Sequence, residues 1–168
     1  MAEYLDLKLF MTHVGIENFV AEYDGVIGYA GMNNFYLYRY AGANKFRFLA
    51  WDKDVTFWAP DYSIWEFTNT NVLMRRALVY PELRDTYLET LYKAAQSAAK
   101  DEWLATEIER IYLQTRDVAY ADTRKPFNNS QFDENVELLR KFARLRIPFV
   151  LDAVTRAGYF PPAEPVVE

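Results

Sequence analysis

The sequence contains no cysteine and only one histidine, His13, among its 168 residues. Without thiols, disulfides, cysteine-ligated zinc and iron–sulfur clusters are all excluded. A single histidine also argues against histidine-rich metal sites and against a Ser-His-Asp triad. If the protein catalyses a reaction, carboxylates must carry most of the chemistry.

Long apolar runs and an excess of positive charge are missing as well. No run approaches the roughly 20 residues that span a bilayer, and the Met-Ala-Glu-Tyr start lacks the pattern of a signal peptide. The formal net charge is -5, which gives no sign of a polyanionic partner. We therefore expect no membrane span and no nucleic-acid partner.

What the chain does have is core-forming material, because 51% of its residues are apolar and 17% are aromatic. A disordered chain is much poorer in both. The length suits one domain rather than two. We expect a single domain over residues 1–160, followed by a proline-rich tail over residues 161–168.

The first third of the chain predicts a helix, a loop and a hairpin. Apolar residues recur at helical spacing over residues 4–20. A loop with three glycines in seven residues, from Gly25 to Gly31, follows. Two aromatic-rich runs, residues 34–40 and 45–51, are separated by four turn residues, which is typical of a β-hairpin.

Beyond the hairpin the pattern becomes helical. Residues 55–71 show no clean period and are expected to form an ordered loop. Apolar residues at helical spacing predict helices near residues 72–78, 81–95, 103–118 and 131–157, with Ser130 as the cap of the last one. We expect the apolar stripes to form the core. The predicted fold class is α+β and mainly helical, with one hairpin packed against about five helices.

Two aspartates follow the second predicted strand directly, at Asp52 and Asp54. If the strand continues through them, both carboxylates lie on one face. Neighbouring carboxylates raise each other's pKa unless a cation or donors lie between them. A hard cation such as Mg²⁺ suits that geometry. The alternative is that each aspartate caps a loop or pairs with a basic residue.

The order of the neighbouring elements favours phosphoryl transfer. In protein kinases a helix leads to a loop with a catalytic aspartate and then an asparagine, and two strands and a metal-binding aspartate follow. This chain has the same order, with Asp24, then Asn33 or Asn34, then the hairpin and Asp52. Such chemistry needs neither cysteine nor additional histidines.

These residues also carry a resemblance to a known family. Residues 34–38 read Asn-Phe-Tyr-Leu-Tyr, and residues 51–57 read Trp-Asp-Lys-Asp-Val-Thr-Phe. The chain resembles the carboxyl-terminal part of the CotH kinase family, named for a bacterial spore-coat protein, whose members show a similar aromatic strand and a Trp-Asp-x-Asp-x-Thr-Phe-like motif. The similarity continues more loosely through residues 71–76, the helix after Pro81 and the closing helix with Phe142 and Arg146.

The resemblance implies a kinase C-lobe-like fold and an atypical protein kinase. Such a kinase uses ATP and Mg²⁺ to phosphorylate serine or threonine on coat or surface proteins, which places it in the spore coat, at the cell surface or outside the cell. By match of position, Asp24 corresponds to the catalytic loop acid. Asp52 corresponds to the metal and nucleotide ligand, with Asn34 and Asp54 as its companions.

Two departures from the family pattern qualify this expectation. The interval from Asp24 to Asn34 is longer than the family's loop, because it carries the insertion around Gly25 to Gly31. The family's amino-terminal lobe, with its ATP-contacting basic residue, has no counterpart in the sequence. We therefore expect a fragment of a longer parent chain, which holds metal but is incomplete as a kinase without that lobe.

Two other functions fit parts of the pattern. A non-catalytic surface or coat module could keep the kinase-like scaffold for protein binding. The aromatic residues Trp58, Tyr62 and Trp65 are expected to form either a recognition patch or the lid of the core. A glycosidase with paired carboxylates is the weaker alternative, because Asp52 and Asp54 are close in sequence for groups that must flank a sugar.

Overall fold

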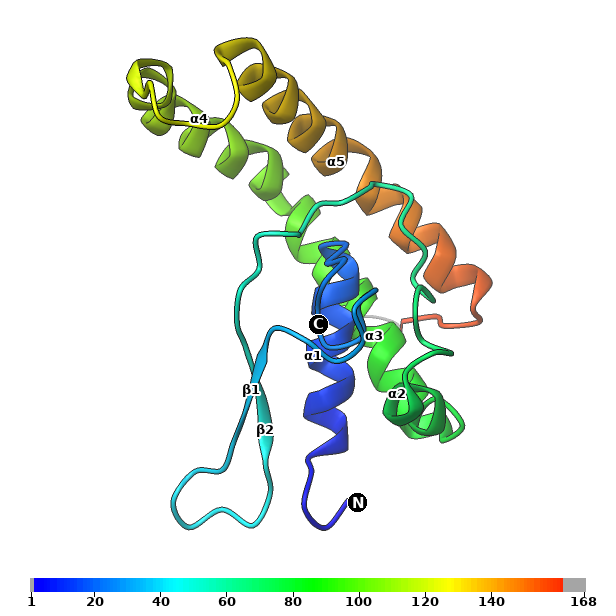
Figure 1. The fold of residues 1–168 in the computed structure, drawn as a ribbon. Helices are drawn as coiled ribbons and strands as arrows, with labels where there is room; N and C mark the ends of the chain where they lie inside the picture. The colour runs from blue at the N-terminus through cyan, green and yellow to red at the C-terminus, as the bar shows by residue number, and fades with distance from the viewer. Residues whose placement is uncertain (1, 162–168) are drawn as a thin grey trace.

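The computed structural model describes residues 2–161, so the predicted tail at residues 161–168 lies almost entirely outside the described residues. The elements follow one another along the chain as shown in Figure 1. They are α1 (Leu7–Phe19), β1 (Phe35–Tyr38), β2 (Arg47–Ala50), α2 (Val72–Ala77), α3 (Pro81–Ala99), a 3-10 turn (Lys100–Glu102), α4 (Trp103–Ala121) and α5 (Asn129–Arg156).

The mainly helical α+β fold with one antiparallel hairpin is confirmed. As predicted, residues 55–71 form a loop without a helix or strand. Within residues 2–161, no helix is both long enough and apolar enough to cross a membrane.

Helix α1 lies at the centre of the molecule. The side chain of Asp6 accepts a hydrogen bond from the Leu9 amide at 3.1 Å and so caps its first turn. Phe10 and Val14 are buried against the other helices. A Cβ at Gly15 would lie 2.9 Å from the Thr90 side chain of α3, so this glycine allows the two helices to approach closely.

Helices α3 and α5 complete the core around α1 (Figure 1). Pro81 occupies the first position of α3, where the main-chain N–H that proline lacks would have no partner within the helix. The buried residues of the two helices recur at three- and four-residue spacing. They are Leu83, Tyr87, Leu88, Leu91, Ala95 and Ala98 on α3 and Val136, Phe142, Ala143, Arg146, Val150 and Val154 on α5.

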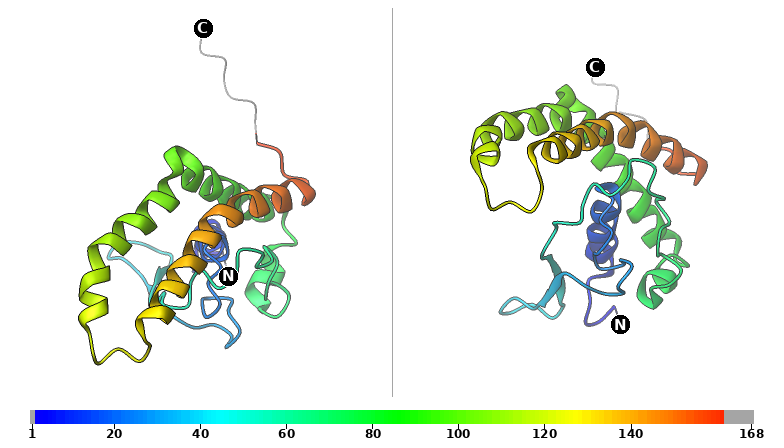
Figure 2. Two further views of the ribbon diagram at one scale, coloured as in Figure 1. Left: turned by 90° about the horizontal axis from the view of Figure 1, so that it is seen from above. Right: turned by 45° about the horizontal axis from the view of Figure 1, so that its top comes forward.

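Helix α4 and the first half of α5 lie side by side and extend away from this core (Figures 1 and 2). Only Leu104 of α4 is buried, whereas Ile111 and Val118 are 47% and 73% exposed. The expectation that every apolar stripe forms core is therefore wrong for α4. The cap of α5 also differs from the prediction, because Asn128 rather than Ser130 begins the helix, in a capping box with Gln131.

The hairpin packs against one side of α1. Its register pairs Phe35 with Ala50 and Tyr38 with Arg47. Phe48 contacts Phe10 of α1, with ring centroids 5.2 Å apart. Most other hairpin side chains are exposed, so one phenylalanine in each strand supplies the inner contact and the aromatic outer surface remains uncovered.

Candidate functional site

The loop after α1 holds Asp24 in a set of hydrogen bonds. Its Oδ2 accepts bonds from the side-chain amides of Asn33 and Asn34, each at 3.0 Å. The Asn34 amide also donates to the main-chain oxygen of Asp24 at 2.9 Å. The other carboxylate oxygen, Oδ1, is buried and has no hydrogen-bond partner within the described residues. Asp24 is thus fixed in place and still short of one donor.

Asn34 links this loop to the turn after the hairpin. Its backbone is left-handed, with φ +53°, a conformation that asparagine tolerates better than most residues. The Asn34 carbonyl accepts a hydrogen bond from the Trp51 amide at 3.1 Å, one step beyond the β1–β2 pairing. Asp52 follows Trp51. The structure therefore brings Asp24, Asn34 and Asp52 to the same end of the hairpin.

Asp52 and Asp54 lie in an exposed turn rather than in a strand. Strand β2 ends at Ala50, and Asp52 has φ +44°, so the predicted continuation of the strand is wrong. Both aspartates are exposed. Neither carboxylate takes part in a hydrogen bond or ion pair with any residue from 2 to 161.

Sequence analysis missed a fourth acidic group, Glu17, which is buried on α1. Its Oε1 accepts a hydrogen bond from Lys53 Nζ at 2.6 Å and lies 3.0 Å from His13 Nε2. Its Oε2 accepts a hydrogen bond from the Val26 amide at 2.9 Å. A Cβ at Gly25 would lie 2.6 Å from Oε2, so glycine is needed where the loop passes this carboxylate. The i, i+4 spacing of His13 and Glu17 on one helix was the available signal.

The two buried glutamates near Asp24 have opposite protonation tendencies. Burial alone would raise the pKa of Glu17, but the bonds and charges of His13 and Lys53 outweigh it and hold that pKa below its ordinary value. Burial raises the pKa of Glu22. The hydrogen bond that its Oε1 accepts from the Asp24 main-chain amide, at 2.9 Å, lowers the pKa but only partly offsets the effect of burial. Glu22 Oε2 is buried without a partner in the described range.

Arg146 of α5 donates hydrogen bonds to both ends of the segment, from the end of α1 to Tyr62, that contains the candidate site. Its guanidinium is fully buried and donates to the carbonyls of Asn18 and Phe19 at the end of α1, at 2.6 and 2.9 Å. It also donates to the carbonyls of Pro60 and Tyr62, which follow the aspartate turn. Burial lowers the pKa of Arg146 to about 10, which leaves the side chain charged at neutral pH.

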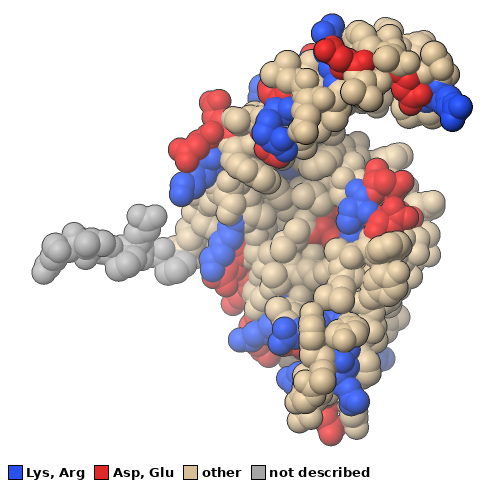
Figure 3. All heavy atoms as spheres, turned by 90° about the vertical axis from the view of Figure 1, so that its left-hand side faces the viewer, with Lys and Arg blue, Asp and Glu red and all other residues tan. Residues whose placement is uncertain are grey.

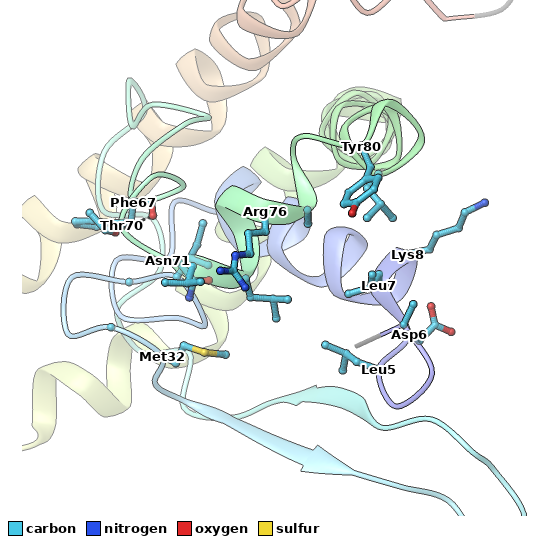
Figure 4. A pocket seen from close by; sticks show the side chains of 18 of the residues that line it. Leu5, Asp6, Leu7, Lys8, Met32, Phe67, Thr70, Asn71, Arg76 and Tyr80 are labelled. Atoms are coloured by element: carbon cyan, nitrogen blue, oxygen red, sulfur yellow. Dashed lines mark hydrogen bonds between the residues drawn. The ribbon is translucent and has the colours of Figure 1, made fainter.

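A large cavity lies beside these carboxylates rather than over them. It has a volume of about 1270 Å³ and is enclosed by the start of α1, the loop after Gly28, α2 and the start of α3. Figure 4 shows Arg76 extending from α2 into this space, near Asn71 and Met32. None of the four predicted site residues lines it. The loop after α1 carries Asp24 and also lines the cavity, and it is the segment that connects the two.

Charges around the site come from individual groups rather than from a broad patch. On the face that carries the hairpin, basic and acidic side chains are interspersed (Figure 3). Of the predicted recognition patch, Trp58 is 59% exposed, whereas Tyr62 is buried and Trp65 packs against the core. Trp58 instead stacks on Tyr23, with ring centroids 4.5 Å apart.

The donor set available for a metal consists of oxygens. Asn34 uses its side-chain nitrogen to hold Asp24, and its Oδ1 accepts no hydrogen bond from any residue between 2 and 161. That oxygen and the carboxylates of Asp52 and Asp54 suit Mg²⁺, which is usually held by one or two carboxylates together with waters and phosphates. Within the described residues, no group of three His, Cys, Asp or Glu side chains is placed to hold a metal alone. Donors of this kind hold a magnesium ion only when waters or phosphate oxygens complete its coordination.

A helix, a loop with Asp24 and Asn34, a hairpin and an aspartate turn, all packed on further helices, define a kinase-like domain. The family model described as CotH kinase protein matches residues 1–150, and the chain belongs to that family. No curated protein and no solved structure matches the chain.

Proposed function

We propose that this chain is the metal-holding lobe of an atypical protein kinase that transfers phosphate from ATP to serine or threonine of coat or surface proteins. The observation that carries the proposal is the hydrogen-bonded link from Asp24 through Asn34 to Trp51. This link places the acid of the loop beside the aspartate turn, as phosphoryl transfer requires. Membership in the CotH kinase family supports it.

In this proposal each predicted residue has one role. The acceptor hydroxyl attacks the γ-phosphorus of ATP, its proton passes to Asp24, and the bond to the β-phosphate oxygen breaks to release ADP. Asp24 Oδ1, the oxygen without a donor, receives that proton. Asp52 and Asn34, with Asp54 beside them, would hold Mg²⁺, which neutralises phosphate charge when bound.

The proposal includes an amino-terminal lobe of the same parent chain as a partner. The outer surface of the hairpin supports this part, because its aromatic side chains are about half exposed along the hairpin, from Trp51 next to Asp52 to the turn at the other end. These are Tyr36, Tyr38, Tyr40 and Trp51. Such a patch is typical of an interaction surface. We propose that the second lobe and the nucleotide base cover it.

Transfer of label from ATP tests the proposed activity. The chain, alone and as part of a parent polypeptide with the second lobe, is incubated with labelled ATP, Mg²⁺ and an acceptor protein rich in serine and threonine. We expect the two-lobed protein to label the acceptor, and Asp24→Asn and Asp52→Asn each to reduce the rate by about 10²-fold or more. Asp117→Asn, at an exposed position of α4, serves as the matched control. Equal rates in Asp52→Asn and wild type would remove the proposed role of the turn.

A second candidate function is protein binding without catalysis, and the cavity favours it. Leu5, Ile27 and Leu83 form buried apolar walls, while Lys8, Lys45 and Arg76 supply positive charge. None of these three cations forms an ion pair within residues 2–161. Apolar walls with unpaired cations suit a polypeptide segment that carries apolar and acidic side chains.

Titration of the chain with a coat or surface protein separates the two functions. If the protein is a binding module, Val72→Asp in the cavity weakens the complex more than tenfold, and Asp52→Asn leaves its affinity unchanged. If binding serves catalysis at the carboxylates, the affinity for the acceptor in the presence of ATP and Mg²⁺ also depends on Asp52. Val79→Asp, an exposed change outside the cavity lining, controls for added charge.

A further inference from the structure

The turn that carries the two exposed aspartates is fixed to the body by main-chain hydrogen bonds at both ends. On one side, the Trp51 amide donates to Asn34 at 3.1 Å. On the other, the Tyr23 amide donates to the carbonyl of Val55 at 3.1 Å. Between these two points the Lys53 carbonyl accepts a hydrogen bond from the Thr56 hydroxyl at 3.0 Å, which is a contact within the same segment. No main-chain hydrogen bond joins residues 52–54 to the rest of residues 2–161. The position of the turn therefore depends largely on its side chains.

Lys53 is the side chain of this turn that points inward. Its Nζ lies 2.6 Å from Glu17 Oε1, and the two side chains are only 26% and 7% exposed. The other oxygen of the same carboxylate accepts a hydrogen bond from the Val26 amide. Glu17 therefore connects the turn directly to the loop that carries Asp24.

The direction of Lys53 determines the direction of its neighbours. Lys53 is held inward by Glu17, whereas Asp52 and Asp54 on either side of it are both exposed. The ion pair therefore fixes the middle of the turn and leaves its two aspartates at the surface. An alternative rotation of the turn would bring a carboxylate toward Glu17, which repulsion between buried negative charges disfavours.

We infer that Glu17 and Lys53 form a positioning pair that keeps Asp52 and Asp54 directed outward at a fixed place relative to Asp24. Neither member of the pair touches the reacting atoms. The consequence for metal binding rests on the proposed function, whereas the placement of the turn does not. The simpler alternative is a buried ion pair with a purely structural role, whose loss would lower stability without moving the turn.

Amide hydrogen exchange in the metal-free protein tests the placement. We compare wild type with Lys53→Met, with the conservative Lys53→Arg and with the double variant E17Q/K53M, which buries no unpaired charge if Lys53→Met fails to fold. We expect exchange of the Trp51 amide and its neighbours to quicken by about tenfold in Lys53→Met and in the double variant, with amides in the α3 core unchanged. Lys53→Arg restores slow exchange.

The Glu89–Lys93 pair on α3 is a matched control, because its N–O distance is also 2.6 Å but both side chains are largely exposed. The variant E89Q/K93M should leave exchange at the turn unchanged. Equal exchange at Trp51 in wild type and E17Q/K53M overturns the inference. So does an increase spread evenly over all protected amides, because a purely structural role predicts that result.

Terbium luminescence tests the consequence for the metal. Tb³⁺ alone is added, and its emission is excited through tryptophan, since Trp51 adjoins Asp52. We expect E17Q/K53M to bind Tb³⁺ about tenfold more weakly than wild type, a typical loss when residues that orient metal ligands are removed. Unchanged affinity counts against the pair. If wild type and Asp52→Asn bind Tb³⁺ equally, the proposed metal site fails, and hydrogen exchange alone decides the positioning role.

Discussion

Asp24 and Asp52 lie at the same end of the hairpin in very different surroundings. Asp24 accepts hydrogen bonds from the side-chain amides of Asn33 and Asn34, which hold it in the loop after α1. Asp52 is exposed, sits in a left-handed turn, and has no hydrogen-bond partner in the described part of the chain. The difference shows how one site separates two tasks. A group that orients a hydroxyl needs a fixed position, while a group that binds a cation needs open oxygens.

The two surroundings also differ in what they contribute to folding. Donors around Asp24 would be left unsatisfied without it, and buried unsatisfied groups cost free energy. Nothing around Asp52 depends on its carboxylate in the same way. Substitutions on the Asp24 side should therefore lower stability, and substitutions on the Asp52 side should chiefly change binding.

The largest expected effect comes from Arg146, which holds both sides together. Arg146→Met removes the donors of four main-chain carbonyls. Each buried orphan costs about 1–3 kcal/mol before relaxation, so we expect a total loss of about 3–5 kcal/mol in the free energy of unfolding. Urea denaturation measures it. Arg156→Met, on the exposed end of α5, is the matched control. A loss below about 1 kcal/mol would show that the four bonds are not needed.

Asp24→Ala tests the first side of the comparison. It removes the carboxylate that the side-chain amides of Asn33 and Asn34 share, although the Asn34 amide keeps the main-chain oxygen of residue 24 and Asn33 is exposed. We therefore expect a loss of about 1 kcal/mol by the same measurement. Asp24→Asn keeps an acceptor oxygen and should cost less. If Asp24→Ala and Asp52→Ala are equally stable, the contrast drawn between the two aspartates is incorrect.

A smaller effect is the opposite pH dependence of the two buried glutamates. The folded-state pKa of Glu17 is lowered, so its stabilisation is present above the ordinary value of 4.5 and is lost as the pH falls through the folded pKa. The folded-state pKa of Glu22 is raised, so its stabilisation is present below 4.5 and is lost as the pH rises through the folded pKa. Glu17 thus changes the free energy of unfolding below pH 4.5, and Glu22 changes it above pH 4.5.

Thermal unfolding between pH 3 and pH 7 checks these signs. Relative to wild type, Glu17→Gln should be most destabilising at pH 7 and less so at pH 3. Glu22→Gln should shift in the other direction, toward relative stabilisation at pH 7. Parallel curves for the two variants would contradict the assigned directions.

Local patterns predicted the fold well because they arise from neighbouring residues. The hairpin, the proline start of α3 and the apolar spacing of α5 each follow from residues within a few positions of one another. The exposed stripe of α4 could not be foreseen, because periodicity reports an apolar face but not whether another element covers it. Which carbonyls Arg146 would reach also lay beyond the sequence, since they lie more than 80 positions away.

The candidate site shows the same limit. The order Asp24, Asn34, Asp52 was apparent from motif spacing, and hydrogen bonds join the first two residues. The strand geometry assumed for Asp52 and Asp54 was wrong, because a left-handed residue ends the alternation. Glu17 and Lys53 are 36 positions apart, and no local pattern connects them. Long-range ion pairs of this kind require the fold.

The smallest expected effect sharpens the second side of the comparison. Without metal, Asp52→Asn should change the free energy of unfolding by no more than about 0.5 kcal/mol, because the carboxylate is exposed and has no partner within residues 2–161. With Mg²⁺ at a concentration equal to its dissociation constant, wild type should gain about 0.4 kcal/mol, since an ion that binds only the folded state stabilises it. Asp52→Asn should gain less. Denaturation with and without Mg²⁺, with Ca²⁺ as a larger cation for comparison, measures both terms. An equal gain in the two proteins would mean that the ion binds elsewhere, and a large loss without metal would mean that Asp52, like Asp24, is part of the folded framework.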